Sequence, residues 1–411
     1  MSALLLPSRF VYFRNISSFL KPQNKIRQDY GGKLRRRNLE KIEVMNAENR
    51  EISNDLDNPR SVFVTSNFVQ ETEDGNVSHH EAKALAAVTQ LERVLTDTDI
   101  KYKLLRLPST MRSFLLDYFM AHELKNKKVD LAFFHGAPFG ITMRVLKPAK
   151  TIVAITAHNM ELSKEEFERQ NGQGPLPLDD LTDPFLWDIY SQHIQNADMV
   201  LCPSKLGAAY ISTKLPLKNR MAVIPHGCFL PEESQIRSPE DFCIAHVGAN
   251  VTDKGQVYLV QAWHKLTQDP KFSGRLVLVG RGASLWAPFE VFSSEHVGKI
   301  GKVYCDCSVY VQPSVTEGFG IQVLEAMAYA RPVIVAEGAG ACELVEDGKE
   351  GFVVPIRDPD AIKEKIEYFY DNSDEIRRMG KNARKKAEKY SWEIIENRYQ
   401  KLIKEVLNEK S

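Results

Sequence analysis

Short apolar runs alternate with helical patterns along most of this chain. Runs rich in valine, isoleucine and leucine predict buried strands, whereas apolar residues that recur every three or four positions predict helices, such as one over residues 79–95. In the first half, the predicted strands cover residues 61–65, 102–107, 131–134, 151–156, 199–202 and 221–224. Strands that alternate with helices in this way predict a parallel sheet with helices on both faces.

The same alternation starts again after a proline-marked stretch at residues 225–239. New strands are predicted at residues 242–247, 275–279, 309–311, 332–335 and 352–354. The pattern therefore predicts an α/β chain with two Rossmann-like domains. Ligands of such sheets bind beyond the carboxyl ends of the strands, so we expect the reacting cleft to lie between the domains. A last helix, residues 392 to about 407, carries an apolar stripe that ordinary core packing explains.

The first 60 residues differ from the rest of the chain. Up to Arg37 they contain nine lysines or arginines and one acidic residue, Asp29. We interpret them as a weakly ordered basic extension. A dispensable leader, a misassigned start codon, an organelle transit peptide and an arm that touches anionic lipid all remain open. No apolar run approaches the ~18 residues that span a bilayer, so we expect a cytoplasmic protein, with peripheral contact to the inner membrane face as an open alternative.

Length and composition narrow the class of protein. The 411 residues give room for about two domains, each with its own core. The 54 basic and 54 acidic residues balance, so no overall field favours nucleic acid. Six cysteines are sparse for this length and indicate reduced core residues. Cys305 and Cys307 have no matching Cys or His pair at zinc-like spacing, so no metal site is predicted.

The most informative motif is EGFGIQVLEAMA, residues 317–328, which places two carboxylates around a glycine-bracketed helix start. Gly318 and Gly320 allow a tight turn before a helix that begins at Ile321. The first amides of a helix lack intrahelical partners and its dipole is positive there, so phosphate oxygens suit this position. Glu317 at the mouth is better placed for sugar hydroxyls. A solvated helix stripe that includes Glu325 is the alternative.

At these residues the chain resembles the retaining glycosyltransferases of family four. Their signature is a glutamate, seven residues and a second glutamate, and the similarity continues through residues 331–335, 342–348 and 351–355. The resemblance implies the GT-B fold: two Rossmann-like domains facing a central cleft and a C-terminal helix that crosses back to the first domain. We accordingly expect a basic extension (1–60), an acceptor domain (61–226), a nucleotide-sugar domain (227–391) and a crossover helix (392–411).

The resemblance also implies roles for residues of the second domain. Glu325 would hold the ribose hydroxyls of the donor, and Glu317 would contact the transferred sugar. The backbone of Gly318, Phe319 and Gly320 would approach the diphosphate and the sugar. Two cations of the family bind the diphosphate. The first position is Ala249 here, whereas Lys254 occupies the second, and Arg281 is the candidate replacement for the missing arginine.

In the first domain, His158 ends a predicted strand and resembles the histidine that the family places near the reacting centre. His135 ends the preceding strand. A strand-end histidine is often only a hydrogen-bonded structural residue, so this reading stays open for both. Gly75 lies in a loop that faces the cleft in the family, although a plain turn explains it equally well. We interpret Ser204 first as a helix N-cap and His226 as a hinge residue.

These features predict a retaining, metal-independent transfer of a sugar from a UDP- or GDP-linked donor to a glycan, a lipid-linked acceptor or a small molecule, with no resident cofactor and no nucleic-acid partner. Three alternatives remain. A sugar-nucleotide epimerase would share the fold. A phosphorylase would require a pyridoxal lysine, for which no motif is visible. A degenerate GT-B subunit that only binds is favoured by Ala249 and by the single glycine at Gly75.

Overall fold

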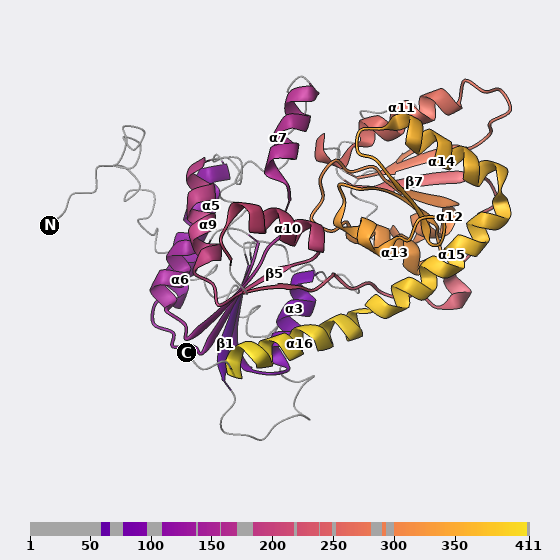
Figure 1. Ribbon diagram of the computed structural model, residues 1–411. Coiled ribbons are helices and arrows are strands. Elements are labelled where there is room, and N and C mark those ends of the chain that lie inside the picture. The colour runs from indigo at the N-terminus through magenta and orange to yellow at the C-terminus, as the bar shows by residue number, and fades with distance from the viewer. Residues whose placement is uncertain are drawn as a thin grey trace, which may run out of the picture.

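The computed structural model describes residues 59–65, 77–96, 109–136, 139–156, 158–170, 184–217, 220–237, 239–248, 252–280, 290–292 and 300–408. Two six-stranded parallel sheets lie side by side, each flanked by helices (Figure 1).

The first sheet has the strand order β2-β1-β3-β4-β5-β6, and every neighbouring pair is parallel. Its strands are β1 (Arg60–Thr65), β2 (Gln90–Thr96), β3 (Leu131–His135), β4 (Lys150–Ala154), β5 (Met199–Cys202) and β6 (Met221–Val223). All five residues of β3 are buried, because both faces of a parallel sheet are covered. The helices of this half are α3 (Val77–Ala86), α5 (Ser109–Leu124), α6 (Gly140–Leu146), α7 (Met160–Arg169), α9 (Pro184–Gln195) and α10 (Lys205–Lys214).

The second sheet has the order β12-β11-β10-β7-β8-β9 and is also parallel throughout. Its strands are β7 (Cys243–Val247), β8 (Arg275–Val279), β9 (Glu290–Phe292), β10 (Val309–Gln312), β11 (Val333–Ala336) and β12 (Gly351–Val354). Its main helices are α11 (Gln256–Leu266), α12 (Ile300–Asp306), α13 (Ile321–Ala328), α14 (Pro359–Asp371) and α15 (Ser373–Ala387). The strand order reverses at β7, which places a ligand crevice between β7 and β10.

The last helix, α16 (Trp392–Asn408), leaves the second half of the chain and runs back beneath the first sheet (Figure 1). Its apolar face packs with Phe63 of β1 and Leu85 of α3 in one buried cluster. The chain also passes between the two halves at residues 224–232. This connection lies against the start of α16, because the Cys228 amide donates to the Tyr390 carbonyl (2.9 Å). The predicted crossover helix is confirmed.

One predicted element is wrong. The helix expected over residues 79–95 ends at Ala86, and the chain then enters β2 beside β1. The Thr89 hydroxyl donates to the Leu85 carbonyl (2.7 Å) and pairs with the Ser61 hydroxyl (2.7 Å) of β1. These bonds close the helix end and tie the following residues to the sheet. The strand predicted at residues 102–107 lies outside the described residues.

Candidate functional site

A cavity of about 330 Å³ lies between the carboxyl ends of the two sheets. The first sheet contributes the ends of β3, β4, β5 and β6, and the second contributes the loops after β7 and β10. The lining residues are Val77, His135, Thr156, His158, Pro203, His226, Lys254, Glu317, Gly318, Phe319, Gly320, Ile321 and Gln322. The cavity therefore brings together candidates from segments that lie far apart in the sequence.

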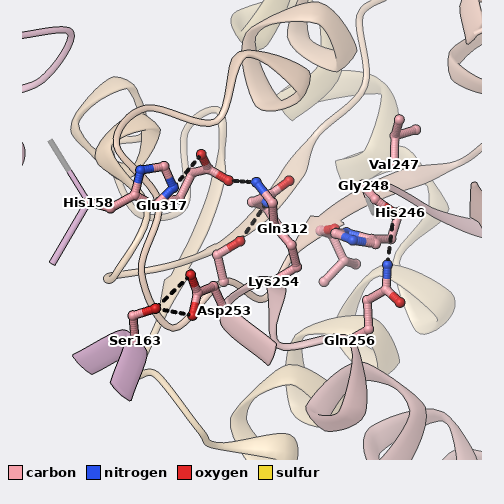
Figure 2. A network of polar contacts seen from close by, with 12 residues as sticks. His158, Ser163, His246, Val247, Gly248, Asp253, Lys254, Gln256, Gln312 and Glu317 are labelled. Carbon is pink, nitrogen blue, oxygen red and sulfur yellow. Dashed lines mark hydrogen bonds and ion pairs between the residues drawn. The ribbon is translucent and has the colours of Figure 1, made fainter. Parts of the chain in front are cut away.

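Glu317 is the centre of a charged cluster in this cavity (Figure 2). One carboxylate oxygen pairs with the Lys254 ammonium, and the other lies 3.6 Å from His158 Nε2. Lys254 and Glu317 come from the second sheet, whereas His158 reaches in from the first. Among the described residues that line the cavity, Glu317 is the one carboxylate.

Lys254 is held at the end of β7 by a short helical turn, Thr252–Lys254, that precedes α11. The turn packs closely against the loop after β10. The packing leaves no room for a side chain at Gly255, since a Cβ there would overlap the Pro313 carbonyl oxygen. Burial lowers the pKa of Lys254 to about 8, and the charge of Asp253 opposes this shift. The ammonium is therefore a desolvated cation, for which an anionic ligand is a strong partner.

His158 lies in the loop between β4, which ends at Ala154, and α7, and it precedes Asn159, whose side chain caps α7 by accepting from the Glu161 and Leu162 amides. Burial, and then the charge of Lys254, lowers the pKa of His158 to about 3, so its imidazole is neutral. Its Nδ1 atom is buried and has no hydrogen-bond partner among the described residues. Because Nδ1 is shielded from solvent, Nε2 is the ring nitrogen that faces the charged cluster.

The glycine turn after Glu317 brings the two halves into contact. A Cβ at Gly318 would overlap the Thr156 carbonyl oxygen, and the Gly318 carbonyl accepts from the Ser204 hydroxyl (2.7 Å). Gly320 has a φ of 90°, a left-handed conformation, and α13 begins at the next residue without a side-chain cap. The amino end of α13 therefore opens into the cavity through Ile321 and Gln322.

Glu325 lies farther along α13 and is not among the residues that line the cavity. Its carboxylate accepts a hydrogen bond from the buried Tyr304 hydroxyl of α12 (2.7 Å). Gln322, Glu325 and Tyr329 are all half-buried, so they do not form a solvated stripe. The ribose-binding role of Glu325 remains a prediction.

The remaining first-domain candidates lie as follows. His135 and His226 both line the cavity, and His226 packs edge-on against Phe319 with ring centroids 5.1 Å apart. Ser204 caps α10, as predicted, by accepting from the Gly207 amide (3.0 Å). Gly75, Ala249 and Arg281 lie outside the described residues, and their predicted roles stay predictions.

The sequence did not predict the contacts by which Ser163 and Glu166 of α7 join the two halves, here called the clamp. Helix α7 follows β4 of the first sheet but docks on the second. Ser163 donates to both carboxylate oxygens of Asp253 (2.9 and 3.0 Å), next to Lys254 (Figure 2). Glu166, fully buried, accepts from the Tyr258 hydroxyl (2.7 Å) and from Arg357 Nε (2.7 Å). Its partners lie 92 and 191 residues away, so no local pattern signals them.

The described part of the chain shows neither a metal-ligating cluster nor a membrane-spanning helix. No group of three or more His, Cys, Asp or Glu side chains there is arranged to hold a metal ion. Likewise, none of its helices is long and apolar enough to cross a membrane.

Solved structures identify the class of fold. Sucrose-phosphate synthase from Thermosynechococcus elongatus superposes with a TM-score of 0.62 over 84% of this chain and 98% of that one, at 18% identity. The Anabaena protein HepE, solved with UDP-glucose, gives a TM-score of 0.56 over 84% and 99%, at 15% identity. The chain has the GT-B fold of glycosyltransferases, as the sequence predicted.

Sequence comparison finds similarity to glycosyltransferases. Residues 231–386, which hold the second sheet, match the family described as glycosyl transferases group 1. An uncharacterized glycosyltransferase of Methanocaldococcus jannaschii, MJ1178, is 32% identical over 48% of this chain and 57% of its own length. The chain spans about half the length of the curated relatives it matches.

Proposed function

We propose that the protein is a retaining glycosyltransferase that moves a sugar from a nucleotide-sugar donor to a hydroxyl of an acceptor. The single observation that carries the proposal is the convergence of His158, Lys254 and Glu317 with the open end of α13 in one cavity between the sheets. A cation, helix amides and a carboxylate are the groups that bind the diphosphate and the sugar of such a donor.

In this proposal, the donor diphosphate binds beside Lys254 and the amino end of α13. It displaces the Lys254 ammonium from Glu317, because both anions compete for one cation. Glu317 then accepts hydrogen bonds from hydroxyls of the transferred sugar, and Glu325 holds the ribose. Charge that develops on the leaving diphosphate is stabilised by Lys254 and the helix dipole, without a metal ion. Closure of the two halves excludes water.

Retention of configuration is proposed because the chain resembles the retaining glycosyltransferases of family four. A double displacement needs a free carboxylate nucleophile on the face opposite the leaving group. The one carboxylate among the described lining residues is Glu317, and in this proposal it binds hydroxyls of the transferred sugar once the donor is in place. We therefore propose a front-face displacement. The acceptor oxygen bonds to the anomeric carbon as the carbon–phosphate oxygen bond breaks, and the hydroxyl proton passes to the departing diphosphate oxygen.

A uridine diphosphate sugar is the first donor to test, since the structural neighbour HepE was solved with UDP-glucose. A mass-spectrometric screen of UDP- and GDP-sugars with saccharide, glycolipid and small-molecule acceptors tests the activity. The expected result is a product heavier than its acceptor by one sugar residue, with release of the nucleoside diphosphate. Conversion of the donor to an epimer without an acceptor would instead identify an epimerase. Binding without turnover would indicate a degenerate subunit.

A further inference from the structure

The amino end of α10 is held by the other half of the molecule. The Glu343 carboxylate, from a short helical turn of the second half (Gly340–Leu344), accepts hydrogen bonds from the Lys205 amide (3.1 Å) and the Leu206 amide (2.6 Å). These are the first two amides of α10. The first amides of a helix have no intrahelical partner and the helix dipole is positive there, so a carboxylate is a favourable partner.

A second contact between the halves lies beside this one. Ser204, which caps α10, donates its hydroxyl to the Gly318 carbonyl (2.7 Å). Gly340 packs against both groups and leaves no room for a side chain, because a Cβ there would overlap the Ser204 hydroxyl and the Gly318 carbonyl oxygen. The amino end of α10 therefore meets the loops after β10 and after β11 at one place.

The loop that carries Glu343 also holds the turn that carries Glu317. The Gly340 amide donates to the Glu317 carbonyl (3.0 Å). The Ala341 amide donates to the Phe319 carbonyl (2.6 Å). Because these bonds join the two loops through their backbones, a shift of the loop after β11 also moves the turn that places Glu317 in the cavity.

The contact at Glu343 opens more easily than the clamp on α7. Glu166 of the clamp is fully buried, whereas Glu343 is exposed. Water and salt compete with the hydrogen bonds of an exposed carboxylate, so their release costs little free energy. Release of a buried carboxylate leaves a costly unpaired charge. The two halves are therefore fastened more firmly through α7 than through α10.

We propose that Glu343 is a positioning residue that acts as a releasable latch. Its docking on α10 fixes the turn of Glu317 against the cavity, and its release loosens that turn. The proposal rests on the proposed glycosyl transfer and deepens it, because it names a residue that sets the contact between Glu317 and the transferred sugar. Glu343 itself is not among the residues that line the cavity. Lys254 and Glu325, assigned to the diphosphate and the ribose, are held on other elements and stay in place.

Amide hydrogen exchange of the full chain, read by nitrogen-15 NMR, tests the latch without any ligand. Glu343→Gln keeps the shape of the side chain, but its NH2 group turns a donor toward one of the two backbone amides. We expect the Lys205 and Leu206 amides to exchange roughly tenfold faster in this variant, which is the typical loss when a helix cap is removed. The Gly340 and Ala341 amides should also exchange faster, because the loop that contains them is released.

Glu346→Gln is the matched control, because Glu346 lies on the same loop, pairs with Lys349 (2.7 Å) and is 65% exposed. It should leave all four amides unchanged. Unchanged exchange at the two α10 amides in Glu343→Gln would overturn the proposal, as would faster exchange there without a change at the two loop amides. A uniform rise that includes the core strand β3 would also overturn it, because Glu343 would then support the whole fold and not this turn.

Calorimetric titration with UDP and with UDP-glucose then tests the positioning role. In Glu343→Gln, the affinity for UDP should equal that of the native chain. The affinity for UDP-glucose should fall roughly tenfold, the loss of one or two ordinary hydrogen bonds, because Glu317 no longer faces the sugar. An equal loss for both ligands would overturn the proposal, since Glu343 would not act through Glu317. Failure of the native chain to bind either ligand would contradict the uridine donor of the proposed function instead, and the exchange pattern would still decide the role of Glu343.

Discussion

Lys254 and Glu317 neutralise each other inside the cavity, and this pair decides how a donor can bind. Two charges that are largely out of water must be paired. The diphosphate of a nucleotide sugar is a stronger anionic partner for the Lys254 ammonium than the Glu317 carboxylate is. Donor binding is therefore an exchange of anions at Lys254, which frees the Glu317 carboxylate for sugar hydroxyls. His158 stays neutral beside both groups, so it adds hydrogen bonds and no charge.

Lys254→Met should weaken donor binding while leaving the fold intact. Loss of one charge-assisted contact removes about 1.5–3 kcal/mol, or roughly ten- to a hundredfold in Kd, and leaves Glu317 as an unpaired negative charge facing the diphosphate. Equilibrium dialysis with radiolabelled UDP-sugar measures the change. The control is Lys265→Met, because Lys265 pairs with Asp360 on the surface (2.6 Å). Equal donor affinities of the two variants would show that Lys254 does not contribute to donor binding.

Buried neutral histidines predict loss of stability in acid. Burial lowers the pKa of His193 to about 3 from an ordinary value of 6.5. The folded chain therefore binds fewer protons than the unfolded chain between these values. The contribution is complete above pH 6.5 and is lost as the pH falls toward 3.

About one pH unit below the ordinary histidine pKa, this linkage removes roughly 1.4 kcal/mol of unfolding free energy. Urea unfolding near neutral pH and at that lower pH should show the loss in the native chain and a loss smaller by this amount in His193→Asn. The same pH dependence in both proteins would show that His193 is protonated when folded.

At the scale of elements, the strands were predictable and one helix end was not. Short, continuous apolar runs predicted β1, β3, β5, β8 and β12 to within one or two residues, because a strand that is buried on both faces is apolar at successive positions. The helix predicted over residues 79–95 was too long, because Leu85, Val88 and Leu91 also fit a helical spacing. The pairing of β2 with β1 stabilises the strand through residues that are distant in the sequence, so a pattern of neighbouring residues cannot reveal it. The clamp through Glu166 could not be predicted from the sequence for the same reason.

Glu166→Gln should lower the unfolding free energy by about 2–4 kcal/mol, because it leaves Arg357 and Tyr258 facing an uncharged amide in a buried site. Glu165→Gln is the matched control. Glu165 is the adjacent residue, is 61% exposed and also approaches Arg357 (3.5 Å), so its removal should cost no more than about 1 kcal/mol. Urea unfolding of both variants gives the comparison. Similar losses would mean that α7 does not fasten the two halves.

At the scale of the whole molecule, the two halves touch closely enough for single glycines to control their approach. Gly318 has no room for a Cβ against Thr156 of the other half, and Ser204 bonds the Gly318 carbonyl across the same contact. The paired glutamates, the second-domain lysine and the strand-end histidine were all recognisable in the sequence. Their meeting at Glu317 was not, because it depends on how the halves close.

Gly318→Ala should hold the halves apart. The added methyl group overlaps the Thr156 carbonyl oxygen, so relief requires a shift of one half against the other. Small-angle scattering should show a larger radius of gyration than the native chain, and donor affinity should fall with it. An unchanged radius together with unchanged donor affinity would contradict the closed arrangement.

The central claim is that the cavity between the sheets binds a nucleotide sugar, and calorimetric titration of the full chain with UDP- and GDP-sugars tests it most directly. The account predicts saturable binding of one donor class, with affinity lowered in both Lys254→Met and Glu325→Ala. Absence of binding heat with every donor at several temperatures would contradict it.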